Sequence, residues 1–188
     1  MMTIQTPGMR MGLMTVVLAM ALALPVQDAS AATAPEIDAR VNAALDRLHK
    51  EVKGSDAVTS KAAGYLVFPG VIKAGFVIAG EGGEGALRIG GKTAGYYNIV
   101  SGSVGFQGGA QKRDIIIAFM DAGSLKKFQE SDGWKAGADA SVALIDVGAG
   151  ANVDISKIKE PVVGFVVGQS GLMAGVSIDG SKITRTKK

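Results

Sequence analysis

Apolar residues near the start of the chain recur at helical spacing. Pro35, Glu36 and Asp38 suit the first turn of a helix, and Lys50 suits its last turn. The spacing predicts an amphipathic helix over residues 35–52 and a short second helix over residues 55–63. The apolar stripe of the first helix either packs on the rest of the domain or lies in a membrane surface. Acidic residues diluting its basic side favour packing. The stripe consists of Ile37, Val41, Ala44, Leu45, Leu48 and Val52.

From Gly64 onward the period changes to that of β-strands. The segment Asp114–Met120 is apolar on both faces, which indicates a central strand. Asp121 then suits the N-cap of a helix that continues to residue 129, with Leu125 and Phe128 directed inward. The predicted strands cover residues 64–69, 74–80, 85–90, 95–100, 102–111, 113–120, 134–147, 150–156, 161–168 and 171–179.

Many glycines lie inside these predicted strands. Because glycine weakens a strand, we expect bends, bulges or close approaches of two layers at such positions. The expected fold class is α+β and mainly β. A curled antiparallel sheet or sandwich carries the N-terminal amphipathic helix and one further helix packed on it.

The first 31 residues have the pattern of a signal peptide. Arg10 is the only charged side chain before Asp28, and an apolar run over residues 11–26 leads to Ala29-Ser30-Ala31, a small-x-small cleavage site. We therefore expect a signal peptide over residues 1–31 and a single domain over residues 32–188 with a short basic C-terminal tail. An uncleaved membrane anchor is the alternative.

Composition narrows the class of protein. The chain has no cysteine, which excludes disulfides, thiolate metal ligands and a lipid-modified cysteine. The formal net charge of +3 is too mild to favour nucleic-acid binding. Together with the N-terminal pattern, these features favour a bacterial periplasm or outer surface.

Motifs that resemble catalytic or cofactor sites lack their required context. Residues 80–85 match G-x-G-x-x-G, but a strand rather than a helix follows, so a hairpin turn is favoured over nucleotide binding. His49 is the only histidine, and we expect it to be a solvated helix residue. The spacing of Asp139, Asp146 and Asp154 is too sparse for a calcium loop. We expect no enzyme activity, no catalytic residues, no cofactor and no metal.

The chain resembles the SYLF (Ysc84-type) lipid-binding family. In that family, a strand ending as Val67-Phe68-Pro69 does here is followed by a turn like Lys73-Ala74-Gly75-Phe76. Further matches follow in family order at residues 102–111, 137–143 and 171–180. The resemblance is to a bacterial exported member. It implies phospholipid binding, with phosphoinositides and actin as partners of eukaryotic members. Neither partner is expected in an exterior bacterial compartment.

Cations near turns and large apolar side chains are the candidate lipid contacts. Lys73 stands beside a tight turn and Phe76. The basic segment 182–188 suits an anionic membrane surface, although a disordered solubilising tail explains the same residues. Trp134 suits either a membrane interface or a partly buried helix-to-strand junction. The full candidate set is Lys73, Phe76, Lys112, Arg113, Trp134, Lys135, Lys182, Arg185, Lys187 and Lys188.

Three hypotheses about function follow. The favoured one is an exported, non-catalytic domain that binds anionic phospholipid at the cell envelope, in the periplasm or peripherally on a membrane. The second is a structural or adhesive envelope protein that binds a protein partner without a lipid role. The third, a small outer-membrane barrel, has to explain the few aromatic residues and the lysine-rich end.

Overall fold

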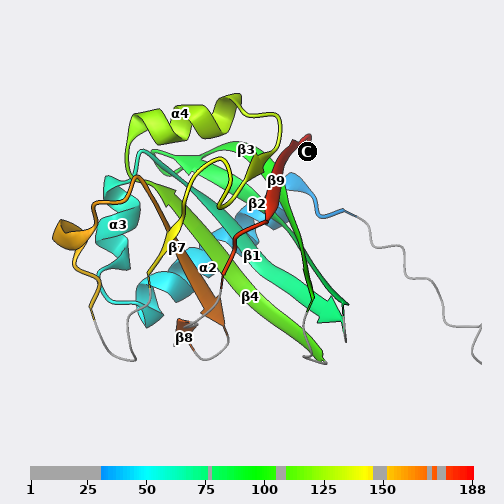
Figure 1. Ribbon diagram of the computed structural model, residues 1–188. Coiled ribbons are helices and arrows are strands. Elements are labelled where there is room, and N and C mark those ends of the chain that lie inside the picture. Colours follow the sequence, from blue (N-terminus) through cyan, green and yellow to red (C-terminus); the bar gives the residue numbers. More distant parts are fainter. Residues whose placement is uncertain (1–30, 76–77, 105–108, 146–151, 169–170, 173–176) are drawn as a thin grey trace, which may run out of the picture. The chain divides into compact units, whose positions relative to one another are not determined.

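The computed structural model describes residues 31–75, 78–104, 109–145, 152–168, 171–172 and 177–188 (Figure 1). Within them two helices come first, and a long β region follows that is interrupted by a third helix and a 3₁₀ turn. The helices are α2 (Ala34–Glu51), α3 (Ser55–Lys61), α4 (Ala122–Glu130) and a 3₁₀ turn, η2 (Ile155–Lys157). The strands are β1 (Gly64–Gly75), β2 (Ile78–Ile89), β3 (Lys92–Val104), β4 (Gly109–Phe119), β5 (Trp134–Lys135), β6 (Ala143–Leu144), β7 (Val162–Gly168), β8 (Gly171–Leu172) and β9 (Lys182–Thr186).

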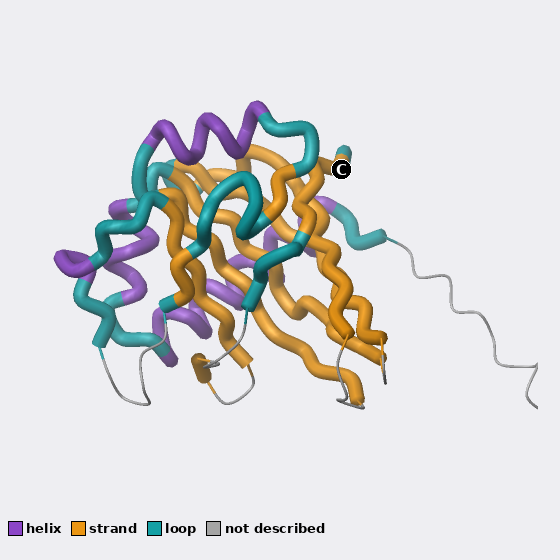
Figure 2. Tube along the Cα trace, viewed as in Figure 1, coloured by secondary structure: helices purple, strands orange, loops and turns teal. Residues whose placement is uncertain are grey.

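One curled, mainly antiparallel sheet contains these strands, which confirms the expected fold class (Figure 2). The strand order is β5-β9-β3-β2-β1-β4-β7-β6, and β8 pairs with β7. Among the described strands, only β6 runs parallel to its neighbour, β7. The four long strands lie in the order β3-β2-β1-β4, and each is antiparallel to its neighbours among them.

Helix α2 covers one face of the sheet, as its apolar stripe predicts. Ile37, Val41, Ala44 and Leu48 are buried, whereas Leu45 is only partly buried. Their neighbours on the sheet include Val67, Ala86, Ile116 and Phe165. At the start of the helix, the Thr33 backbone N–H donates to Glu36 Oε2 at 2.8 Å, which satisfies a group that would otherwise lack a partner.

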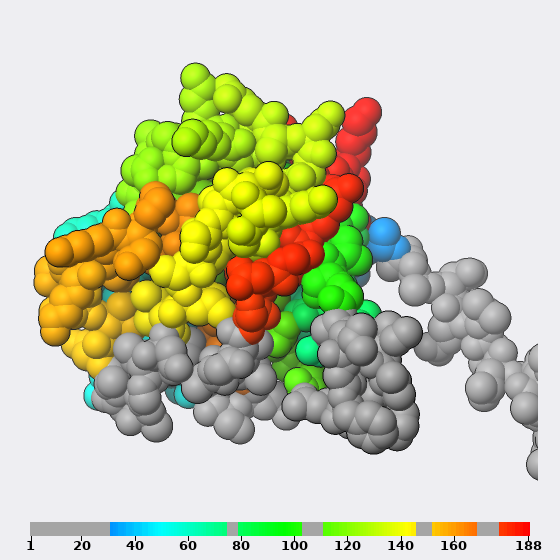
Figure 3. Space-filling view, viewed as in Figure 1, coloured from blue at the N-terminus to red at the C-terminus, as the bar shows by residue number. Residues whose placement is uncertain are grey.

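The opposite face carries a second core, over which α4 lies. The predicted N-cap is confirmed, because Asp121 Oδ1 accepts from the Ser124 backbone N–H at 2.8 Å. Leu125 and Phe128 are buried, as expected. Figure 3 shows this side of the molecule, where the residues that follow α4, in yellow, lie between α4 and the C-terminal residues, in red.

Strand β4 is central, as its sequence predicts. It pairs with β1 on one side and β7 on the other. Ile115, Ile117 and Phe119 enter the α4-side core, while Ile116 and Ala118 enter the α2-side core. A strand buried on both faces cannot show the apolar–polar alternation of a half-exposed one, which explains its continuous apolar run.

Several predicted strand boundaries are wrong. Residues 74–80 and 102–111 each span a reversal between two long strands rather than forming one strand. The segment 134–147 contains only the short β5 and β6, and the described part of 150–156 contains no strand. Of 171–179, only β8 is a strand among the described residues. Glycines and alanines carry no strong strand signal, so the sequence pattern misplaced these limits.

The glycine-rich segment 80–85 is also not the predicted turn. It lies inside β2, opposite a β1 irregularity between Val67 and Ile72. A Cβ on Gly85 would lie 2.1 Å from the Val67 carbonyl oxygen, and a Cβ on Gly83 would lie 2.9 Å from Val71 Cγ2. The glycines therefore allow close approach at a bulge, as expected from their place in strands.

Candidate functional site

Six residues line up across the sheet beyond the part that α2 covers. The register pairs Lys135 with Lys182, Lys182 with Val100, Val100 with Gly82, Gly82 with Ile72, and Ile72 with Lys112. Directly paired residues of antiparallel strands have side chains on the same face. We call this set the exposed row. Figure 1 shows β1 and β4 continuing past α2.

The exposed row combines apolar and cationic side chains. Ile72 is 54% exposed and Val100 is 52% exposed, and these are the exposed large hydrophobic residues of the described chain. Gly82 separates them with no side chain of its own. The lysines at both ends are exposed. The next row toward the strand ends pairs Gly102, Gly80, Ala74 and Ala110, which are all small residues.

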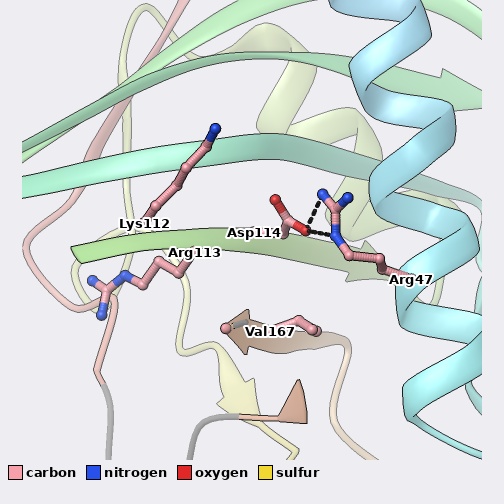
Figure 4. A pocket seen from close by; sticks show the side chains of 6 residues that line it. Arg47, Lys112, Arg113, Asp114 and Val167 are labelled. Atoms are coloured by element: carbon pink, nitrogen blue, oxygen red, sulfur yellow. Dashed lines mark hydrogen bonds and ion pairs between the residues drawn. The ribbon is translucent and has the colours of Figure 1, made fainter. Parts of the chain in front are cut away.

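A cleft of about 320 Å³ adjoins Lys112 at one end of the row (Figure 4). Its lining comes from α2, β4 and the end of β7, at Arg47, Lys112, Arg113, Asp114, Val167 and Gly168. Asp114 Oδ2 accepts from Arg47 Nε at 2.8 Å and from Nη2 at 2.6 Å. Asp114 Oδ1 accepts from the Gly70 backbone N–H at 2.7 Å. Both oxygens of this buried carboxylate are therefore engaged.

Gly70 allows Lys112 to reach this position. Its φ of 64° lies in the left-handed region, which glycine adopts without steric strain. A Cβ at this position would lie 2.6 Å from Lys112 Cε. The Lys112 side chain consequently lies across the β1 bulge, close to the Arg47–Asp114 pair.

Arg113 leaves β4 on the other side from Lys112, as Figure 4 shows. Its guanidinium donates to both oxygens of Glu81, with Nε 2.9 Å from Oε1. Arg113 is 4% and Glu81 is 8% exposed, so the two opposite charges form a buried pair. A buried ion pair of this kind is a structural feature whose charges cancel locally.

Comparison with known proteins places the exposed row in context. Residues 100–188 match the family model described as "Ysc84: Las17-binding protein actin regulator". The resemblance to the SYLF (Ysc84-type) family is thereby confirmed. The matched residues contain four members of the row, which are Val100, Lys112, Lys135 and Lys182. The other two members, Ile72 and Gly82, precede the matched range.

A curated relative extends the SYLF similarity further along the chain. SH3 domain-containing YSC84-like protein 1 from Xenopus laevis is 27% identical over 136 residues. The alignment covers 70% of this chain and 40% of that relative. The chain therefore matches less than half of the relative's length.

The structure places the remaining candidate lipid contacts on different faces or in the core. Lys73 pairs in register with Glu81, which puts it on the face of Arg113 rather than of Ile72. Phe76 lies outside the described residues. Trp134 is 3% exposed and packs edge-on against Phe119 and Phe128, with ring centroids 6.2 and 5.8 Å away. This burial agrees with the junction alternative.

The C-terminal segment is a strand rather than a free tail. Residues 182–186 form β9, and Ile183 is 1% exposed between Ile99 and Trp134. Lys182 faces the exposed row, while Arg185 pairs in register with the buried Tyr97 on the opposite face. Lys187 is exposed. Lys188 Nζ donates to Glu84 Oε1 at 2.5 Å, and its side chain is 8% exposed.

Glu84 joins the two ends of the unit formed by residues 32–188. Its other oxygen, Oε2, accepts from the Ala32 backbone N–H at 3.0 Å. Burial acts to raise the pKa of Glu84, but the hydrogen bonds from Lys188 and Ala32 outweigh it, and the pKa lies below its ordinary value. Glu84 is therefore an ionised anchor for both residues at neutral pH.

Sequence reasoning missed Ile72, Val100, Arg47, Gly70 and Asp114 as parts of one surface. Alternation along β1 does not identify the face of Ile72, because the bulge between Phe68 and Val71 changes the phase. The Arg47–Asp114 pair joins residues 67 positions apart, so no local pattern reports it.

Other classes of site have little support in the described part of the chain. His49 is exposed, as expected, with Nε2 3.0 Å from Thr59 Oγ1. Among the described residues, no group of three or more His, Cys, Asp or Glu side chains is arranged to hold a metal ion. The helices of the described ranges include none with the length and apolarity needed to cross a bilayer.

Proposed function

We propose that this protein is an exported, non-catalytic domain that binds anionic phospholipid at the cell envelope. The observation that carries the proposal is the exposed row, where Ile72 and Val100 stand in solvent between Lys112 and the Lys135–Lys182 pair. The SYLF family, whose members are lipid- or actin-associated, supports it. The cleavage pattern before Ala32 supports export.

The row combines two kinds of attraction to a membrane. Burying the remaining exposed halves of Ile72 and Val100 contributes about 1 kcal/mol each. Each lysine near an anionic surface contributes about 1 kcal/mol. The sum, about 5 kcal/mol, corresponds to a dissociation constant on the order of 0.1–1 mM. The row therefore supports reversible, peripheral association rather than insertion.

The alternative is an envelope protein that uses the same row to bind a protein partner. Apolar side chains with cations on both sides also suit an acidic protein surface. The family description names Las17 binding and actin regulation. An exported bacterial domain does not meet actin, so our proposal is limited to lipid.

Sedimentation with vesicles tests the lipid proposal. We expect the processed protein to sediment with vesicles of phosphatidylglycerol and phosphatidylcholine in low salt, and a smaller part of the binding to persist at 1 M salt. The double variant Ile72→Ser/Val100→Ser should lose this salt-resistant part, because it removes the apolar contacts but not the lysines. Ala43→Ser, an exposed apolar-to-polar change on α2, is the matched control.

Circular dichroism should show that the double variant is folded, since both side chains are exposed. A wild-type protein that does not sediment in low salt and yields no lipid on extraction would contradict the proposal. It would favour the protein-partner alternative.

A further inference from the structure

We propose that the cleft between Arg47 and Lys112 binds the phosphate group of an anionic phospholipid. This inference rests on the proposed function and deepens it, because it assigns the headgroup to a defined subsite beside the exposed row. Three features carry it: a positioned guanidinium, a positioned ammonium and a net charge that matches one phosphodiester.

Arg47 is held in place by a residue that does not compete for the ligand. Asp114 Oδ2 accepts hydrogen bonds from Nε and Nη2 of the guanidinium, and Oδ1 accepts one from the Gly70 backbone N–H. The Arg47 side chain nevertheless remains 50% exposed, and its Nη1 takes no part in these hydrogen bonds. A planar guanidinium anchored on one edge presents its remaining N–H groups to a phosphate oxygen in a fixed direction.

Lys112 supplies the second cation. Figure 4 shows its side chain on the same side of β4 as Asp114, with Arg47 entering from α2. Lys112 forms no ion pair with any described carboxylate. Its stem lies over Gly70, whose missing Cβ leaves the necessary space. Part of the conformational entropy that this side chain would lose on binding is therefore already lost in the free protein.

The charged side chains around the cleft have a net charge that one anion can neutralise. Arg47 and Lys112 contribute two positive charges and Asp114 one negative charge, while Arg113 and Glu81 cancel on the other face. The balance is +1, which one phosphodiester neutralises. The volume of about 320 Å³ lies within the range of small-ligand sites.

The cleft adjoins the exposed row at Lys112. Strand β7 pairs with β4 only from Asp114 to Phe119, so residues 109–113 of β4 continue past the end of β7. Lys112 belongs to both the cleft and the row, and Ile72 is its neighbour on the adjoining strand, about 4.8 Å away. A phosphate in the cleft therefore places the apolar part of the same lipid beside Ile72.

Soluble short-chain lipids separate headgroup binding from membrane association. The processed protein is titrated with dihexanoyl phosphatidylglycerol below its micelle concentration, and backbone amide shifts are followed by NMR. We expect saturable shifts at Asp114, Val167 and Gly168. Lys112→Gln should raise the dissociation constant about tenfold, as loss of one charge-assisted hydrogen bond implies. Lys92→Gln, an exposed lysine at the β2–β3 turn, should leave it unchanged.

Dihexanoyl phosphatidylcholine and inorganic phosphate are the comparison ligands. Phosphatidylcholine should bind more weakly because its choline adds a positive charge to the cationic cleft. If inorganic phosphate binds as tightly as the anionic lipid, the site serves free phosphate and the lipid assignment is wrong.

The two proposals fail in different ways. Equal effects of Lys112→Gln and Lys92→Gln, or no shifts at the cleft amides, would overturn the phosphate site even if vesicles still bind through Ile72 and Val100. Shifts at the cleft with the anionic lipid, but no vesicle sedimentation, would support the phosphate site and contradict peripheral membrane association. Arg47 is left unchanged in these tests because its removal leaves buried Asp114 without its main counter-ion.

Discussion

Glu84 shows how one residue can join distant parts of this domain. Its two oxygens accept from the Ala32 backbone N–H and from Lys188 Nζ, residues at opposite ends of the unit formed by residues 32–188. These hydrogen bonds favour the ionised carboxylate, so the folded pKa lies below the ordinary value of 4.5. A carboxyl group with a lowered pKa stabilises the fold above the unfolded pKa, and this contribution is lost as pH falls through the folded value.

The Glu84→Gln variant tests this linkage. We expect it to be less stable than the wild type at pH 7 by about 1 kcal/mol, as for one partly buried charge-assisted hydrogen bond. The difference should shrink as pH falls below 4.5, measured by urea denaturation across pH. Glu130→Gln, in an exposed i,i+4 pair with Lys126, should change little. A Glu84→Gln deficit that persists unchanged at pH 3 would show that the carboxylate is not the source.

At the scale of elements, β9 combines a structural face with a face toward the exposed row. Ile183 is buried between β3 and β5, whereas Lys182 lies in the row beside Lys135. Deleting residues 182–188 would therefore remove both a core strand and the Lys188–Glu84 pair, and would lower stability as well as lipid binding. Substitution separates the two contributions better than truncation.

The double variant Lys135→Gln/Lys182→Gln should keep its thermal stability and lose several-fold in binding to anionic vesicles at low salt. The loss should disappear at high salt, because the screening length falls from about 10 Å at 0.1 M to about 3 Å at 1 M. Lys126→Gln/Lys127→Gln on α4 removes the same charge from exposed positions outside the row and is the control. Equal losses in both variants would mean that net charge, rather than the row, drives binding.

At the scale of the whole molecule, the proposal depends on export. We expect protein from an envelope fraction to begin at Ala32, because Ala29-Ser30-Ala31 has the small side chains that signal peptidase requires. N-terminal sequencing of that fraction checks this. A mature chain that retains residues 11–26 would be a membrane-anchored protein and would contradict processing.

Local patterns anticipated much of the fold. The helix predicted over 35–52 is α2 at Ala34–Glu51, and the predicted cap at Asp121 and central strand at Asp114–Met120 are both present. Each of these features depends on residues a few positions apart, where spacing and capping chemistry act directly. Strand limits were predicted less well, because glycine-rich segments such as 80–85 read as turns.

The sequence by itself determined the class of fold, the family resemblance, and which residues carry cationic and apolar side chains. Only the tertiary structure decided which of them act together. The bulge at Gly70 shifts the phase of β1 so that Ile72 joins Lys112 and Val100 on one face, while Lys73 and Arg113 lie on the other. Register between strands and the long-range Arg47–Asp114 pair are set by packing of the whole sheet against α2, and they leave no periodic trace along the chain.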